Sequence, residues 1–178
     1  GSEASPAEIT ALVESLGAED YAQREAAAAK LNTIGAAAVD PLLTAAETSG
    51  DLEVALRARW LVDAIPIDAA HDAPAVAKLL ENFKRKDFGE RVQVMHRLLR
   101  ADADEGIEPL ARIVRLDRSA DGARLAAALL AREYRPGDPF WPQLAPQIAA
   151  GLGASGRPAA RFLRAVVEGS AAAPPASA

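Results

Sequence analysis

The chain has no cysteine, and it has only two histidines, one methionine and few aromatic residues. The absence of cysteine excludes disulfide bonds, thiol nucleophiles and thiolate metal sites. Aromatic residues make up 4% of the 178 residues, which leaves little for stacking on nucleic-acid bases. No apolar run approaches the ~20 residues that a membrane-spanning helix needs, so we expect no membrane insertion.

The residues that are abundant favour helices. About a quarter of the chain is alanine, the residue with the best intrinsic helix propensity. β-branched residues are scattered, so no segment has the composition of a strand. The sequence therefore predicts an all-α fold.

Start and stop signals divide the chain into about ten helices. Ser5 and Glu8 have the spacing of a capping box, as do Asp87 and Glu90. Asp20 with Gln23 opens another helix, and Pro66 ends one because proline disfavours helix in the residue before it. The predicted helices span residues 6–16, 20–35, 37–47, 51–65, 73–83, 87–100, 105–116, 119–133, 141–150 and 157–167.

An internal repeat suggests how these helices are arranged. Asp20-Tyr21-Ala22-Gln23-Arg24 recurs 67 residues later as Asp87-Phe88-Gly89-Glu90-Arg91. Four short helices fit in that interval, and stacked helix pairs explain such a period better than a compact bundle does. We therefore predict a right-handed α-solenoid. Its core should include the positions Ala26, Ala27, Leu31, Val94, Met95 and Leu98.

The repeated segment resembles HEAT-type repeats, in particular the divergent HEAT-like repeats of planctomycete and related bacterial proteins. The residues that carry the resemblance are the run from Leu16 to Ala27, Leu31, Ile34-Gly35, Ala38, Pro41-Leu42, the run from Asp51 to Val54, Arg57 and Arg59. The first copy covers residues 16–65 and the second, weaker copy covers residues 87–133. The resemblance implies a fold and a habit of binding other macromolecules, not a reaction.

The predicted domain covers residues 6–168. Residues 1–5 are expected to be a tail that begins with a cloning remnant, Gly1-Ser2, and residues 169–178 a disordered Ala/Pro/Ser tail. Several proteins with such repeats carry a signal peptide, so the resemblance favours the cell envelope or periplasm over the cytoplasm.

No group of residues has the pattern of a catalytic or metal site, and we expect neither an enzyme nor a cofactor. Neither His71 nor His96 has a second histidine at i+3 or i+4, whereas zinc needs three or four converging ligands. The acidic cluster Asp102, Asp104 and Glu105 lacks the pattern of a calcium loop, and we interpret Asp104 as a helix cap.

The repeated polar residues are interpreted as structural. Arg24 and Arg91 occupy equivalent positions after the cap residues Asp20 and Asp87. In stacked helices such arginines pair with carboxylates and carbonyls of neighbouring helices.

A protein partner is the favoured function, and the second helix of each hairpin would line the concave surface. Polar positions predicted to point outward there are Glu47, Lys78, Glu81, Glu108, Arg112 and Arg115. Residues 1–83 contain 14 Asp/Glu and 5 Lys/Arg, whereas residues 84–178 contain 11 and 15. Surface ion pairs are weak at physiological salt, so we expect a monomer there despite this asymmetry.

Two alternatives stay open. The basic residues of the second half could bind phosphates of a nucleic acid; they are Lys84, Arg85, Lys86, Arg97, Arg100, Arg112, Arg115, Arg118, Arg124, Arg132 and Arg135. Interleaved acids and the net charge of −5 make nucleic acid the less favoured partner. A helical-repeat lyase or small-ligand module is the second alternative, for which the sequence shows no nucleophile–base pair.

Overall fold

The computed structural model describes residues 4–133 and 139–171, and those residues contain helices and no strand. The all-α prediction is confirmed to that extent. The chain divides into two compact units, Gly1–Ile65 and Pro66–Ala178. The division falls inside the predicted domain of residues 6–168, whose bounds stay a prediction.

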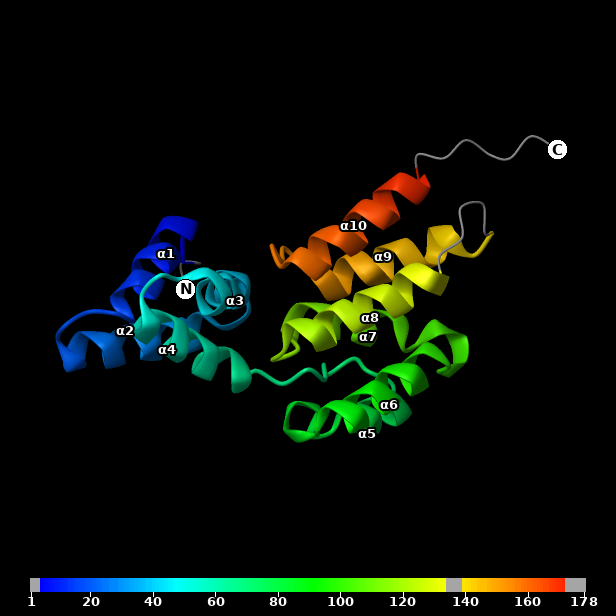
Figure 1. The fold of residues 1–178 in the computed structure, drawn as a ribbon, viewed down its shortest axis with the longest axis horizontal. Coiled ribbons are helices and arrows are strands. Elements are labelled where there is room, and N and C mark those ends of the chain that lie inside the picture. Colours follow the sequence, from blue (N-terminus) through cyan, green and yellow to red (C-terminus); the bar gives the residue numbers. More distant parts are fainter. Residues whose placement is uncertain (1–3, 134–138, 172–178) are drawn as a thin grey trace. The chain divides into compact units, whose positions relative to one another are not determined.

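Unit 1 contains two antiparallel helix pairs (Figure 1). Its elements are α1 (Pro6–Ser15), α2 (Tyr21–Ile34), a 3-10 turn (Gly35–Ala38), α3 (Val39–Thr48) and α4 (Leu52–Asp63). Helix α1 packs on α2, and α3 packs on α4. Across the two pairs, α1 contacts α3 and α2 contacts α4.

Unit 2 also consists of short helices joined by turns (Figure 1). Its elements are α5 (Pro74–Leu80), a 3-10 turn (Phe83–Arg85), α6 (Phe88–Leu99), a 3-10 turn (Asp102–Asp104), α7 (Ile107–Leu116), α8 (Ala120–Glu133), α9 (Trp141–Leu152) and α10 (Pro158–Ala171). Helix α8 lies against α6 and α10, while α7 lies against α8 and α9.

Helix starts follow the predicted caps closely. The Ser5 and Glu8 side chains form a reciprocal capping box, and so do those of Asp87 and Glu90. Asp51 accepts hydrogen bonds from the amides of Glu53 and Val54 and begins α4. Each of these bonds satisfies an amide that has no partner within its helix.

Several predicted helix boundaries differ from the structure by one to four residues, and two of them are misplaced at residues with positive φ. The fifth helix ends at Leu80 rather than at Phe83, because Asn82 adopts a left-handed conformation with φ 55°. Asp104 also has positive φ and does not cap α7, whose N-cap is Gly106. A Cβ on Gly106 would lie 1.8 Å from the carbonyl oxygen of Leu98, so the turn needs a glycine.

The core predictions hold with one exception. Ala27 and Leu31 are buried in unit 1, and Val94, Met95 and Leu98 are buried in unit 2. Ala26 is exposed, so its predicted burial is wrong. With a repeat offset of 67, Ala27 and Leu31 correspond to Val94 and Leu98, and all four residues are buried. Of the predicted C-terminal tail, residues 169–171 belong to α10 and the remainder lies outside the described residues.

Candidate interaction surfaces

The two repeated arginines have similar aromatic partners but different ionic ones. Arg24 lies 5.6 Å from the ring centroid of Tyr21, and Arg91 lies 5.5 Å from that of Phe88. Arg24 donates to the carbonyls of residues 18 and 19 at 2.7 and 2.9 Å. Its Nε lies 3.6 Å from a carboxylate oxygen of Glu53. The cap residues Asp20 and Asp87 bind helix amides instead of these arginines.

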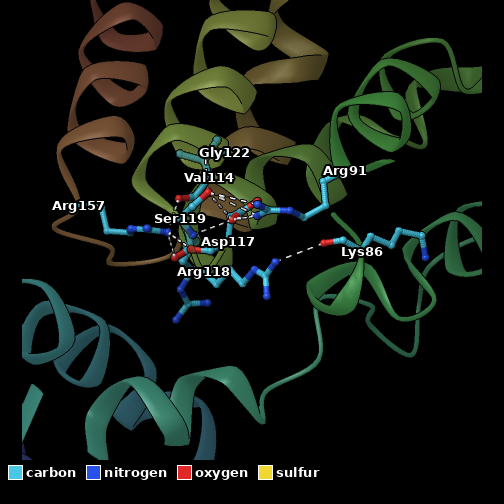
Figure 2. A network of polar contacts seen from close by, with 9 residues as sticks. Lys86, Arg91, Val114, Asp117, Arg118, Ser119, Gly122 and Arg157 are labelled. Atoms are coloured by element: carbon cyan, nitrogen blue, oxygen red, sulfur yellow. Dashed lines mark hydrogen bonds and ion pairs between the residues drawn. The ribbon is translucent and has the colours of Figure 1, made fainter. Parts of the chain in front are cut away.

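Arg91 belongs to a buried polar network around the turn between α7 and α8 (Figure 2). Its guanidinium donates to the carboxylate of Asp117, which also accepts from the amide and the hydroxyl of Ser119 at 2.8 and 3.2 Å. Arg157 reaches the same turn and donates to the carbonyls of Val114 and Asp117 at 3.2 and 2.9 Å. The network joins α6, the α7–α8 turn and the start of α10, which is a structural role.

The α7 residues that were predicted to point outward are buried or half-buried. Arg112 is only 8% exposed, so its predicted outward orientation is wrong. Both carboxylate oxygens of Asp72 accept from Arg112, at 2.5 and 2.6 Å, and Glu108 accepts at 3.1 Å. Glu108 also lies 2.9 Å from Nε2 of His71. The Asp72 and Glu108 carboxylates thus pair with the terminal nitrogens of Arg112 within unit 2, while its buried Nε has no hydrogen-bond partner.

The remaining predicted contact residues are distributed over separate elements. Glu47 is exposed on α3 of unit 1. Lys78 and Glu81 are exposed at the end of α5 in unit 2. Arg115 is half-buried on α7, and its guanidinium lies against Gly153 at the end of α9.

Many of the cations considered for phosphate binding already contact groups of unit 2. Arg124 pairs with Asp121 at 3.1 Å, and Arg118 donates to the carbonyl of Lys86 at 3.4 Å. Lys86 itself donates to the carbonyl of Glu81. Arg135 lies outside the described residues. Within the described part of the chain, no group of three or more His, Asp or Glu side chains has the arrangement of a metal site.

A surface that the sequence analysis missed lies on α4. Leu52, Leu56 and Trp60 recur every fourth residue and are 72%, 51% and 69% exposed. We call these three residues the apolar stripe. Tyr21, on the neighbouring helix α2, is 63% exposed. Clustered apolar exposure of this kind marks interaction sites in soluble proteins.

The opposite face of α4 supplies the core, which explains why the stripe was missed. Val54, Ala58 and Leu61 are buried against the rest of unit 1. A helix with apolar residues on two faces gives a weak amphipathic signal, and the sequence alone does not distinguish core leucines from surface ones. The spacing of Leu52, Leu56 and Trp60 was the available clue.

A shallow groove runs between the stripe and α2. Six residues line it: Glu25, Ala28, Glu53, Leu56, Arg57 and Trp60. Arg57 bridges the two helices, with Nη1 2.7 Å from Glu25 and Nε 2.6 Å from Glu53. The hydrogen bonds that Arg57 donates to Glu53 and, second, to Glu25 raise the pKa of Arg57 above its usual value. The groove thus has a charged side and an apolar side.

The internal repeat shows which face of the fold the stripe occupies. Helix α4 begins at Leu52 and α8 at Ala120, so the stripe corresponds to Ala120, Arg124 and Ala128. These three residues are exposed although α8 packs against α6, α7 and α10. The equivalent position in unit 2 is therefore an exposed surface, where small or charged residues are sufficient for solubility.

Comparisons of this chain with protein-family models, with curated proteins and with solved structures find no match. None of the described helices is both long enough and apolar enough to cross a membrane.

Proposed function

We propose that this chain is a non-catalytic protein-binding module built from stacked, HEAT-like helical repeats. Helix contacts support the stacking. In unit 2, α6, α8 and α10 contact one another in order, and α7 and α9 form a second row beside them. In unit 1, α1 contacts α3 while α2 contacts α4. Contacts between every second helix are characteristic of repeat stacks.

The apolar stripe is the observation that carries the binding function. Exposing Leu52, Leu56 and Trp60 to water has a cost that burial in an interface would remove, at about 25 cal/mol per Å² of apolar surface. The equivalent outer positions of α8 avoid that cost with alanine and arginine. Tryptophan and tyrosine are also the residue types most enriched at energetically important interface positions.

The polar clusters of the chain support a structural interpretation. The guanidinium of Arg112 is bound by Asp72, and that of Arg91 by Asp117. The charges in these clusters are therefore used within the fold, where they fix turns between helices.

The test compares two triple variants in affinity capture followed by mass spectrometry. The stripe variant carries Leu52→Ser, Leu56→Ser and Trp60→Ser. The α8 control carries Ala120→Ser, Arg124→Ser and Ala128→Ser at the equivalent positions. We expect wild type and the α8 control to retain the same partner, whose binding is then measured with purified proteins, and we expect the stripe variant to lose it. Equal retention by all three proteins would reject the α4 surface as the binding site.

A further inference from the structure

The charge surrounding the apolar stripe is negative. Residues 1–65 contain 11 Asp/Glu and only 4 Lys/Arg. The cations nearest the stripe are engaged: Arg57 with two carboxylates, and Arg24 with two carbonyls and Glu53. A third, Arg59, donates to the carbonyl of residue 46 at 3.2 Å. Arg59 is exposed and keeps its charge, but the 11 carboxylates of the unit outnumber its four cations, so an approaching partner meets a net negative charge.

Negative charge is also present at the Trp60 end of the stripe, where no arginine pairs with it in the contacts described above. Asp63 follows Trp60 by three residues and is the last residue of α4. The C-terminus of a helix carries about half a negative elementary charge, and α4 has no basic residue in its last turn to balance it. The same holds for α1, α2 and α3, whereas α5, α6, α7 and α8 each have a basic residue there. The negative charge of the Asp63 carboxylate and that of the helix C-terminus therefore lie together at the Trp60 end of the stripe.

The spacing of the stripe favours a helical partner. Side chains four residues apart on a helix rise by about 6 Å, so the stripe is a row of three side chains about 12 Å long. A partner helix presents rows with the same spacing, which pack between such side chains as ridges into grooves. A peptide that binds by adding a strand would instead need a sheet edge, and the described part of the chain contains no strand.

We infer that the apolar stripe binds a basic amphipathic helix of a partner protein. Apolar side chains of that helix pack on Leu52 and Leu56. A Lys or Arg of the partner lies over the indole of Trp60, near Asp63, where cation–π attraction and the helix end act together. The inference rests on the proposed function, because it names the chemistry of the partner for the same surface.

Two other occupants fit the same charge pattern less well. An anionic membrane would repel a unit with a surplus of seven negative charges, the difference between its 11 acidic and 4 basic residues. In a symmetric dimer through the stripe, each acidic unit would face a second copy of itself. Both occupants are outcomes of the experiment below.

The experiment selects binding peptides from random sequences. A phage library displaying random ~20-residue peptides is panned on the wild-type chain, with depletion on the stripe variant. The enriched peptides are synthesised and their affinities measured by fluorescence anisotropy. Circular dichroism verifies that the stripe variant is folded, and Trp60→Ala alone replaces it if it is not.

The inference predicts enriched peptides with apolar residues at helical spacing and an excess of Lys and Arg, which lose at least ten-fold in affinity on the stripe variant. Peptides that need the stripe but are acidic, or lack helical periodicity, would overturn this inference and leave the proposed function standing. If no peptide distinguishes wild type from the stripe variant, both fail.

Two single variants, each of which removes one negative charge, test the role of the Asp63 carboxylate. Asp63→Asn should weaken binding of the selected peptides about two- to five-fold, as expected for loss of one surface ion pair. Glu14→Gln, an exposed position on α1, is the control and should leave affinity unchanged. Equal effects of the two variants would refute the placement of the cation at Trp60.

Two measurements check the other occupants. Sedimentation of the chain with phosphatidylcholine/phosphatidylserine vesicles should show no stripe-dependent binding, and light scattering at ~150 mM salt should show a monomer. Stripe-dependent vesicle binding, or a dimer that the stripe variant dissociates, would overturn the assignment of a partner helix.

Discussion

Arg91 and Asp117 form an ion pair in which the side chains are only 4% and 0% exposed. At the equivalent position of the first repeat, Arg24 is 20% exposed and its nearest carboxylate, that of Glu53, is 3.6 Å away. The arginine at this repeat position is therefore buried in an ion pair in unit 2, as Arg91, but partly hydrated in unit 1, as Arg24. The two arginines differ because Arg91 pairs with the carboxylate of Asp117, which lies within the α7–α8 turn.

This difference predicts unequal costs of truncation. Removing one partner of a buried pair leaves an uncompensated charge, so Arg91→Ala should lower the free energy of unfolding by about 3–5 kcal/mol. Arg24→Ala should lower it by about 1–2 kcal/mol, because water replaces part of what is lost. Urea denaturation of both variants is the measurement. A larger loss for Arg24→Ala would refute the assigned roles.

The second prediction concerns the turn before α7. Gly106→Ala places a methyl group against the carbonyl of Leu98, so backbone must move, and we expect a loss of at least about 2 kcal/mol. Gly50→Ala is the matched control, because nothing lies within 4 Å of the added methyl group. Thermal melts that place the two variants within about 1–2 °C of each other would contradict the described turn.

The third prediction separates the two apolar faces. Leu31→Ala and Leu98→Ala should each cost about 2–5 kcal/mol, since both side chains are 1% exposed. Leu52→Ala should change stability by less than about 0.5 kcal/mol, as expected of an exposed site. A cost above about 2 kcal/mol for Leu52→Ala would show that the stripe belongs to the core.

Much of the fold could be predicted because its signals are local. Ser5, Asp51 and Asp87 begin helices through hydrogen bonds to amides two or three residues away, which a sequence reveals directly. The end of α5 and the start of α7 were misplaced because left-handed residues such as Asn82 and Ala103 depend on what the next segment packs against. The repeat also predicted five of six buried positions, because equivalent positions share a packing environment.

The candidate site could not be predicted in the same way. Arg112 was expected at the surface because it lies on a polar position of α7, but a carboxylate 40 residues earlier, Asp72, pairs with it. The exposure of Leu56 and Trp60 was missed, because it depends on which face of α4 meets α3. Both errors concern contacts between helices, which hydrophobic periodicity does not determine.

The fourth prediction concerns the nucleic-acid alternative. Several cations of the basic half contact carboxylates or carbonyls of their own unit, so we expect no DNA or RNA binding tighter than ~10 μM at ~150 mM salt. Fluorescence anisotropy with labelled duplex and single-stranded oligonucleotides is the measurement. Micromolar or tighter binding with a steep salt dependence, abolished by exposed-site variants such as Arg97→Glu with Arg100→Glu, would reverse the ranking of the two functions.

The most direct test of the account follows Trp60 itself. Trp141→Phe leaves Trp60 as the only tryptophan of the chain. Its emission and acrylamide quenching are recorded while the captured partner, or a selected peptide, is added to saturation. An interface on the apolar stripe moves a 69% exposed indole out of water, so we predict a blue-shifted emission and at least a two-fold drop in quenching. Unchanged emission and quenching at saturation would show that the partner binds elsewhere, and the central claim would be wrong.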